Sequence, residues 1–316
     1  RFSLTNINLS KLKTKKVENM SQMFSGCESL SSIDLNNFDT SNIKSMQGLF
    51  ENCKSLNQLK ISNFKVSNVM DMSYMFYSCS SLTSLDLDTF VTSKLTNMAF
   101  MFSGCSSLFK LSMKNFDTSN VENMANTFQA CEKLENIDIK NFKTSKVKSF
   151  YGLFSKCHSL SSINLENFDV SNAKDLSAMF YQCEKLTSID IKNFKTSNVL
   201  NMNAMFEGCS FLEKIELLNF DTSKVSDMSY MFSGCSSLSS INLSNFKSSA
   251  LENINHIFRD CSSLTYIDMS SFDLNDFDIV FGPFYGLPDN GTIILNSKAS
   301  KTIIKQLPES WTIKVD

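Results

Sequence analysis

The sequence is poor in residues that interrupt regular structure and in residues that carry most enzyme chemistry. Its 316 residues include three prolines, nine glycines, one tryptophan and two histidines. It has no C-x-x-C pair of the kind that holds structural zinc. It has no glycine-rich phosphate loop, no G-x-S-x-G and no H-E-x-x-H motif. We therefore expect no metal, no other cofactor and no enzymatic activity.

Charge and hydropathy exclude two further classes of partner. The formal net charge is −2 and the pI is near 5.8, so bulk charge does not favour nucleic acid or an anionic membrane. No apolar run approaches the roughly 18 residues that a spanning helix needs, so we expect no membrane insertion within this chain.

What the sequence does contain is a repeat of constant length. The ten cysteines stand at 27, 53, 79, 105, 131, 157, 183, 209, 235 and 261, so that every interval is 26 residues. Self-similarity at 20–29 residues is typical of leucine-rich repeats, whose units stack into a solenoid. The spacing predicts an α/β leucine-rich-repeat solenoid of eleven 26-residue rungs.

Each rung is predicted to run strand, turn, short helix, turn. In the unit 30–55, Ile33-Asp34-Leu35 alternates apolar and polar residues, as a strand with one buried face does. Further along the rung, Met72, Met75, Phe76 and Cys79 follow the spacing of an apolar helical stripe. Stacking would place the strands in a parallel sheet and the helices on the opposite, convex side.

A polar row marks the predicted helix start. The residue before the apolar stripe always has a side-chain oxygen that can accept a backbone N–H of the first turn. The row is Asn19, Ser45, Asp71, Asn97, Asn123, Ser149, Asp175, Asn201, Asp227 and Asn253. These residues predict N-caps.

The two ends of the chain are expected to differ from the repeat. We assign residues 1–289 to the solenoid and 290–316 to a C-terminal capping segment with strands at 292–295 and 311–315 and a helix at about 297–306. The only tryptophan, Trp311, is expected to cover the last rung. Because the chain opens inside a repeat, we expect an N-terminal cap, a leader or both to precede it.

Several repeated rows have a structural interpretation. We expect the cysteines to be buried free thiols rather than disulfides, and the methionine and phenylalanine stripes to be core rather than a binding face. Alternating Asp39, Lys65 and Asp117, Lys143 predict an ion-pair ladder between rungs. A row of asparagines that includes Asn37 is expected to bond the backbone of the adjoining rung.

The exposed row of the predicted sheet is the candidate partner-binding strip. It is polar and mostly acidic, and its carboxylates are Asp34, Asp86, Asp138, Asp190, Glu216 and Asp268. Two interpretations stay open: a solvated sheet face, or an acidic strip that binds a ligand.

Two stretches of the repeat resemble a known family. Residues 115–121, Asn-Phe-Asp-Thr-Ser-Asn-Val, and 101–108, Met-Phe-Ser-Gly-Cys-Ser-Ser-Leu, are similar to the BspA-like leucine-rich-repeat surface proteins, in the variant abundant in mycoplasma-type surface lipoproteins. The resemblance covers residues 4 to about 289. It implies a cell-surface or secreted, extracellular location and a role in adhesion or host-protein binding, and it carries no catalytic residues.

The sequence thus predicts a non-enzymatic interaction module that binds a protein or glycan partner through its repeat surface. The alternative is a structural spacer, or a filament or sheath subunit that self-associates through its ends.

Overall fold

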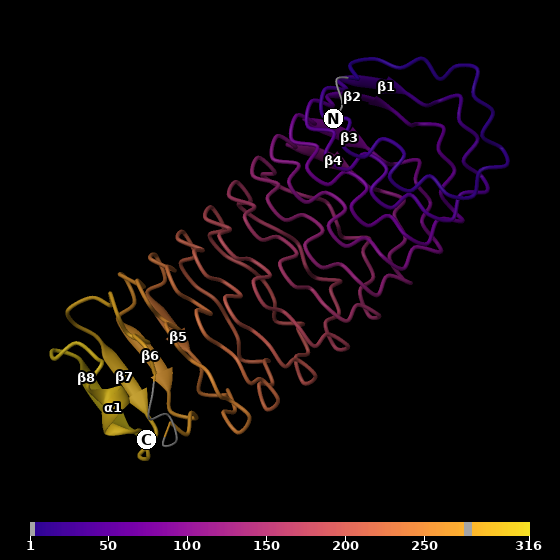
Figure 1. Ribbon diagram of the computed structural model, residues 1–316. Helices are drawn as coiled ribbons and strands as arrows, with labels where there is room; N and C mark the ends of the chain where they lie inside the picture. The colour runs from indigo at the N-terminus through magenta and orange to yellow at the C-terminus, as the bar shows by residue number, and fades with distance from the viewer. Residues whose placement is uncertain (1–3, 275–279) are drawn as a thin grey trace.

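The chain folds as one elongated stack of rungs, with its two ends at opposite tips of the stack (Figure 1). The computed structural model describes residues 4–274 and 280–316, so the opening residues of the predicted first rung lie outside it. Equivalent residues of successive rungs lie beside one another along a single hydrophobic interior that runs from Met20 to Trp311. The predicted solenoid is confirmed.

Short parallel strands occupy one face of the stack. They are β1 (Ser32–Asp34), β2 (Gln58–Lys60), β3 (Ser84–Asp86), β4 (Lys110–Ser112), β5 (Ser240–Asn242) and β6 (Tyr266–Met269). The register joins residues 26 apart, such as Ile33 with Leu59. Two of the sheets have two strands each, β1 with β2 and β3 with β4, whereas β5 and β6 pair at the start of a four-stranded sheet. From 113 to 239 the described segments keep the buried-exposed alternation without assigned strands.

The half of each rung opposite the strands is a run of turns, not the short helix that the apolar spacing predicts. Met75 and Tyr77 donate their N–H groups three residues back, to Met72 and Tyr74, whereas the N–H of Phe76 bonds the carbonyl of Met101 in the next rung. An α-helix would direct all of these bonds along its own axis. Here alternate backbone donors join neighbouring rungs, which a helix cannot do.

The predicted burial pattern is nevertheless correct. Met72, Met75, Phe76 and Cys79 are all fully buried. Successive four-residue turns return the chain to the interior at nearly the same spacing as a helix, so the two conformations share one sequence pattern. Left-handed residues close these turns, with φ between 53° and 60° at non-glycine positions such as Tyr74 and Ala178.

The predicted N-cap row caps turns instead of helices. Asp71 accepts the backbone N–H of Ser73 at 2.8 Å, and Asn19 accepts that of Ser21 at 2.7 Å. The same row forms a parallel β-bridge at every step from Asn19–Ser45 to Asp227–Asn253. This face of the stack therefore has the continuous rung-to-rung hydrogen bonding that the strand face has only in part.

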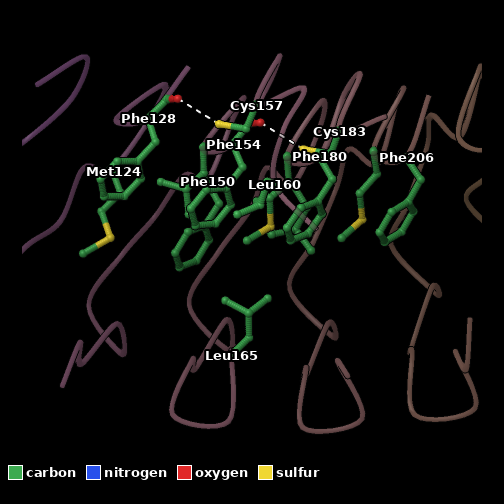
Figure 2. Packing of buried hydrophobic residues seen from close by; sticks show 14 of the residues in the cluster. Met124, Phe128, Phe150, Phe154, Cys157, Leu160, Leu165, Phe180, Cys183 and Phe206 are labelled. Atoms are coloured by element: carbon green, nitrogen blue, oxygen red, sulfur yellow. Dashed lines mark hydrogen bonds between the residues drawn. The ribbon is translucent and has the colours of Figure 1, made fainter. Parts of the chain in front are cut away.

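Stacked aromatic rings and buried thiols fill the interior (Figure 2). Phe128, Phe154 and Phe180 stack with ring centroids 5.5 and 5.7 Å apart. Beside them, the Cys157 thiol donates to the backbone carbonyl of Phe128, with 3.1 Å between sulfur and oxygen. All ten cysteines are free thiols, nine of them buried and Cys27 half-buried, as expected. Burial raises the pKa of the Cys157 thiol to about 12.

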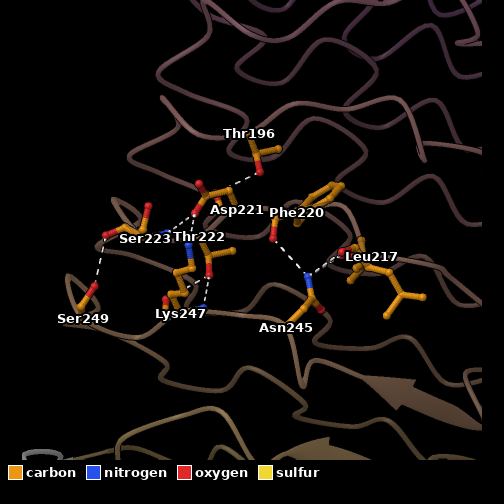
Figure 3. A network of polar contacts seen from close by, with 10 residues as sticks. Thr196, Leu217, Phe220, Asp221, Thr222, Ser223, Asn245, Lys247 and Ser249 are labelled. Atoms are coloured by element: carbon orange, nitrogen blue, oxygen red, sulfur yellow. Dashed lines mark hydrogen bonds and ion pairs between the residues drawn. The ribbon is translucent and has the colours of Figure 1, made fainter.

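Polar ladders join the rungs outside the core (Figure 3). The Thr222 hydroxyl donates to the carbonyl of Lys247 and accepts its N–H, at 2.9 and 2.7 Å. The asparagine row behaves as predicted, since the Asn245 amide donates to three carbonyls of the preceding rung, including that of Phe220. Each amide or hydroxyl thus satisfies backbone groups that the turns leave unpaired.

The alternating charge row forms few ion pairs. Of the successive members from Asp39 to Lys247, only Asp221 and Lys247 come within 4 Å, at 3.6 Å. The carboxylates bond locally instead, as Asp39 does with the hydroxyl of Ser41 at 2.6 Å. The predicted ion-pair ladder is wrong for most rungs. The carboxylate oxygens accept hydrogen bonds from nearby residues of their own turn, and these bonds are favoured over an ion pair with a solvated lysine.

The C-terminal residues continue the sheet. Strand β7 (Thr292–Leu295) pairs with β6, and β8 (Thr312–Val315) pairs with β7. Between them lies α1 (Lys301–Ile304), which is shorter than the predicted helix. Trp311 is 6% exposed, and its indole N–H donates to the carbonyl of Pro288. The tryptophan packs against Gly291, where any side chain would collide with its ring.

Candidate binding face

The six predicted carboxylates lie in one row on the strand face. The register places Asp34 beside Lys60, Asp86 beside Ser112 and Asn242 beside Asp268. All six point away from the buried strand residues, and all but the half-buried Asp268 are exposed. The structure thus aligns these side chains along the stack, and polar or basic residues of intervening rungs separate the carboxylates except Asp190 and Glu216, which lie in adjacent rungs.

Lysines balance much of the acidic charge on this face. Nζ–Oδ2 distances are 3.2 Å for Lys60–Asp34, 3.5 Å for Lys140–Asp138 and 3.0 Å for Lys192–Asp190. Exposed pairs of this kind contribute little to stability, because water and salt screen them. Their main effect is to place positive charge beside three of the six carboxylates, so that the face is not uniformly acidic.

The same row also shapes the backbone. Asp34 accepts the N–H of Asn36 at 3.1 Å, and Asn164 accepts that of Glu166 at 2.9 Å. This bond, followed by the Lys60 ammonium, lowers the pKa of the Asp34 carboxyl. Asx-type capping explains why either Asp or Asn occupies this position in most rungs, because both side chains supply the acceptor oxygen. Sequence reasoning did not identify this second role.

Two hollows meet at Asp190 and Lys192. One, of about 470 Å³, is lined by both residues together with Asn164, Glu166 and Asn193. The other, of about 230 Å³, adds Glu216 and Lys214. Half-buried Ile163 and Ile215 contribute apolar surface to them. We call this region the Asp190 hollow; it combines apolar surface with charged groups of both signs, as binding sites commonly do.

Electrostatics at the centre of the hollow favour the charged forms of both groups. The side-chain bond to Lys192 lowers the pKa of the Asp190 carboxyl, and Asp190 raises the pKa of the Lys192 ammonium. Glu166 and Glu216 add to the second effect from either side. Both side chains are therefore charged at neutral pH, with Nζ and Oδ2 3.0 Å apart.

The described residues contain no cluster of three or more His, Cys, Asp or Glu side chains able to hold a metal ion. Within the same residues, no helix is long and apolar enough to cross a membrane.

Comparison with known proteins identifies the repeat. The family described as "Mycoplasma protein of unknown function, DUF285" matches residues 2–110, 82–189 and 175–289. The sequence matches no functionally curated protein.

Several solved structures are similar at low identity. A leucine-rich cell surface protein of Faecalibacterium prausnitzii is 18% identical over 94% of this chain and 76% of its own, with a TM-score of 0.45. A leucine-rich-repeat protein of Eubacterium ventriosum is 18% identical over 79% and 70%, with a TM-score of 0.41. The T. pallidum leucine-rich-repeat protein is 22% identical over 55% and 70%, with a TM-score of 0.34.

Proposed function

Since the chain belongs to the DUF285 family of Mycoplasma proteins, we propose that it is a non-enzymatic, surface-exposed interaction and adhesion module that binds a protein partner through its strand face. The observation that carries this proposal is the exposed row from Asp34 to Asp268. Where the strands pair, their register aligns the side chains of this row from one rung to the next. The Asp190 hollow is the centre of the proposed interface.

The chemistry of the row, with six carboxylates and fewer lysines, favours a mainly basic polypeptide. Electrostatic complementarity sets specificity and association rate more than raw affinity. The partner would place a basic side chain beside Asp190 and Glu216 and an acidic one beside Lys192, with an apolar residue over Ile163 or Ile215. Such an arrangement has a buried apolar centre and a polar rim, as protein interfaces do.

A charge-only variant tests the proposal. In Asp86→Asn/Asp138→Asn/Asp190→Asn each amide keeps the acceptor oxygen for the backbone bond, as Asn164 and Asn242 already do in this row. Peptides are selected from a random phage-displayed library on the unmodified chain, and their affinities for both chains are measured by biolayer interferometry. We expect the selected peptides to be rich in Lys and Arg and to bind the triple variant at least tenfold more weakly.

A matched control removes three carboxylates elsewhere. Asp39→Asn/Asp117→Asn/Asp169→Asn changes net charge equally and also keeps the local turn acceptors. It should leave peptide affinity unchanged. Equal affinity of the strand-face variant and the unmodified chain would refute the strand face as the binding surface.

Surface display is part of the proposal and has its own test. The repeat resembles that of surface lipoproteins, and this resemblance supports the proposed location. Antibodies against the solenoid should label intact cells that express the full-length gene, and external protease should remove the signal. Labelling that requires permeabilised cells would contradict this location.

A structural spacer or filament subunit is the second candidate. The near-identity of the rungs favours it, as does β8, whose four residues are all exposed at the end of the sheet. Light scattering and electron microscopy at high concentration distinguish the two functions: ordered polymers support the second, and a monomer at all concentrations contradicts it.

A further inference from the structure

The turn face carries aromatic side chains where the backbone disfavours them. One row of the turn run has positive φ in every rung, so that its residues occupy the left-handed region. The row is Gln22, Gly48, Tyr74, Phe100, Asn126, Gly152, Ala178, Ala204, Tyr230, His256 and Gly282. Bulky side chains are costly in this conformation. The fold requires this backbone geometry, and glycine or alanine supplies it in other rungs. Stacking of the rungs therefore does not explain why Tyr74 and Phe100 carry large side chains.

These two residues form a three-ring cluster with Tyr77. The rings of Tyr74 and Phe100 stack with centroids 4.8 Å apart and planes 7° apart. Tyr77 meets both in T-shaped contacts, at 5.6 and 6.3 Å. All three side chains are half-buried, whereas the core ladder of Phe76 and Phe102 is fully buried. The cluster therefore offers aromatic surface to solvent in a fixed arrangement.

Polar groups without positive charge lie in the adjoining rungs. Asn126 stands one rung beyond Phe100 and is only 2% exposed. Gly152 leaves room for the Asn126 carboxamide, because any side chain there would collide with it. Gln129 and Glu51 supply a further amide and a carboxylate.

The absence of cations restricts the ligand. From Gln22 to Gln129, this row and the row three residues later contain no Lys or Arg. Phosphate, sulfate and polyanionic partners would find no counter-charge here. Rings that offer flat apolar surface beside phenol, carboxamide and carboxylate groups match the alternating C–H faces and hydroxyls of a sugar.

We propose that the cluster of Tyr74, Tyr77 and Phe100 is a binding site for neutral carbohydrate. A pyranose ring lays its C–H face on the aromatic surface, while its hydroxyls bond the tyrosine hydroxyls and the half-buried Gln129. The site rests on the proposed role of the chain as a binding module, but it lies on the face opposite the strands. It is therefore independent of the Asp190 hollow.

The test uses defined sugars and the whole chain. Linear hexasaccharides of β1,4-glucose, α1,4-glucose and β1,4-N-acetylglucosamine are titrated by calorimetry and by saturation-transfer NMR, with hexagalacturonate as the acidic comparison. We expect at least one neutral hexasaccharide to bind and the acidic one to bind at least tenfold more weakly. Tyr74→Ala/Phe100→Ala should weaken binding at least tenfold while remaining folded, because Ala178 and Ala204 occupy the same row.

Tyr230→Ala is the matched control. Tyr230 has a φ of 59°, against 58° for Tyr74, and it also contacts an aromatic neighbour, His256. Its loss should leave sugar affinity unchanged, as should the strand-face Asp→Asn triple variant. The proposal is overturned if no neutral hexasaccharide binds at millimolar concentration, if the double variant binds normally with an unchanged melting temperature, or if only peptides bind the cluster.

Discussion

The phenylalanine ladder predicts a stability coupling that depends on rung separation. Phe128 and Phe154 are at most 1% exposed, and their rings stack at 5.5 Å with planes 4° apart. Phe154 also stacks on Phe180 at 5.7 Å. Replacement of Phe154 by Leu removes two stacking contacts of about 0.5–1.5 kcal/mol each. A roughly 1 kcal/mol loss of buried surface and packing adds to this, so we expect a total cost of about 2–4 kcal/mol.

The shared contact can be isolated with a double-mutant cycle. In Phe128→Leu/Phe154→Leu the stack between the two rings is lost only once, so the double variant should be less destabilised than the sum of the single variants. We expect the difference to be about 0.5–1.5 kcal/mol. Phe128→Leu/Phe206→Leu is the matched control. These rings lie three rungs apart, and their effects should add to within about 0.3–0.5 kcal/mol.

Urea unfolding followed by far-ultraviolet circular dichroism supplies the free energies. Trp311 fluorescence reports on the C-terminal end in the same samples. Coincident transitions would show that the stack unfolds as one unit, as the cycle requires. The nearest-neighbour account is refuted if the adjacent pair is additive, or if the distant pair couples as strongly as the adjacent one.

Three further predictions concern single residues. In native protein at pH 8, Ellman's reagent should modify only Cys27, and urea should expose all ten thiols, because burial raises the pKa of Cys157 to about 12. Since that pKa is raised, the thiol's contribution to stability is present below its ordinary pKa and is lost as pH rises toward 12. In Asn193→Ala, loss of an amide that donates to three carbonyls should lower the free energy of unfolding by about 1–3 kcal/mol. Asn219→Ala, where the amide makes one exposed bond, should cost less than about 1 kcal/mol; equal costs in urea would contradict the ladder's role. The Ser112 hydroxyl, the Lys114 backbone N–H and the Lys114 ammonium lower the pKa of Asp88 to about 2, so its contribution is present above its ordinary pKa and is lost as pH falls toward 2. Carboxyl NMR of Asp88 should give that midpoint, and Ser112→Ala should raise it.

The sequence was sufficient to predict the stack, its interior and its asparagine ladder. With a fixed 26-residue period, each rung can stack only with its equivalent residues beside those of the next rung. Each inward side chain must then meet its own copy, as Phe128 meets Phe154. The predicted carboxylate row is likewise exposed and aligned. The binding role of this row stays a prediction. A strand face that contacts only solvent and one that binds a partner have the same alternation of apolar and polar residues.

The turn run could not be predicted for a definite physical reason. The stripe Met72, Met75, Phe76, Cys79 reports which residues are buried, not where backbone N–H groups point. A helix satisfies its donors internally, whereas this run sends alternate donors, such as that of Phe76, to the next rung. One available signal was the row of glycines that includes Gly48 and Gly152. These recur in the middle of the stripe, where a helix would be weakened by about 1 kcal/mol each.

Functional residues in such a chain are best sought where the backbone repeats and the side chain does not. Cysteine, phenylalanine and asparagine rows are nearly constant because each side chain fills the core or bonds the preceding rung. In the left-handed row the backbone is equally constant, with φ of 58° at Tyr74 and 57° at Phe100. The side chain there ranges from glycine to tyrosine, so rung stacking does not determine it. What distinguishes Tyr74 and Phe100 from Tyr230 in this row is the three-ring cluster that they form with Tyr77. Tyr74 and Phe100 are therefore the positions in this row to mutate first.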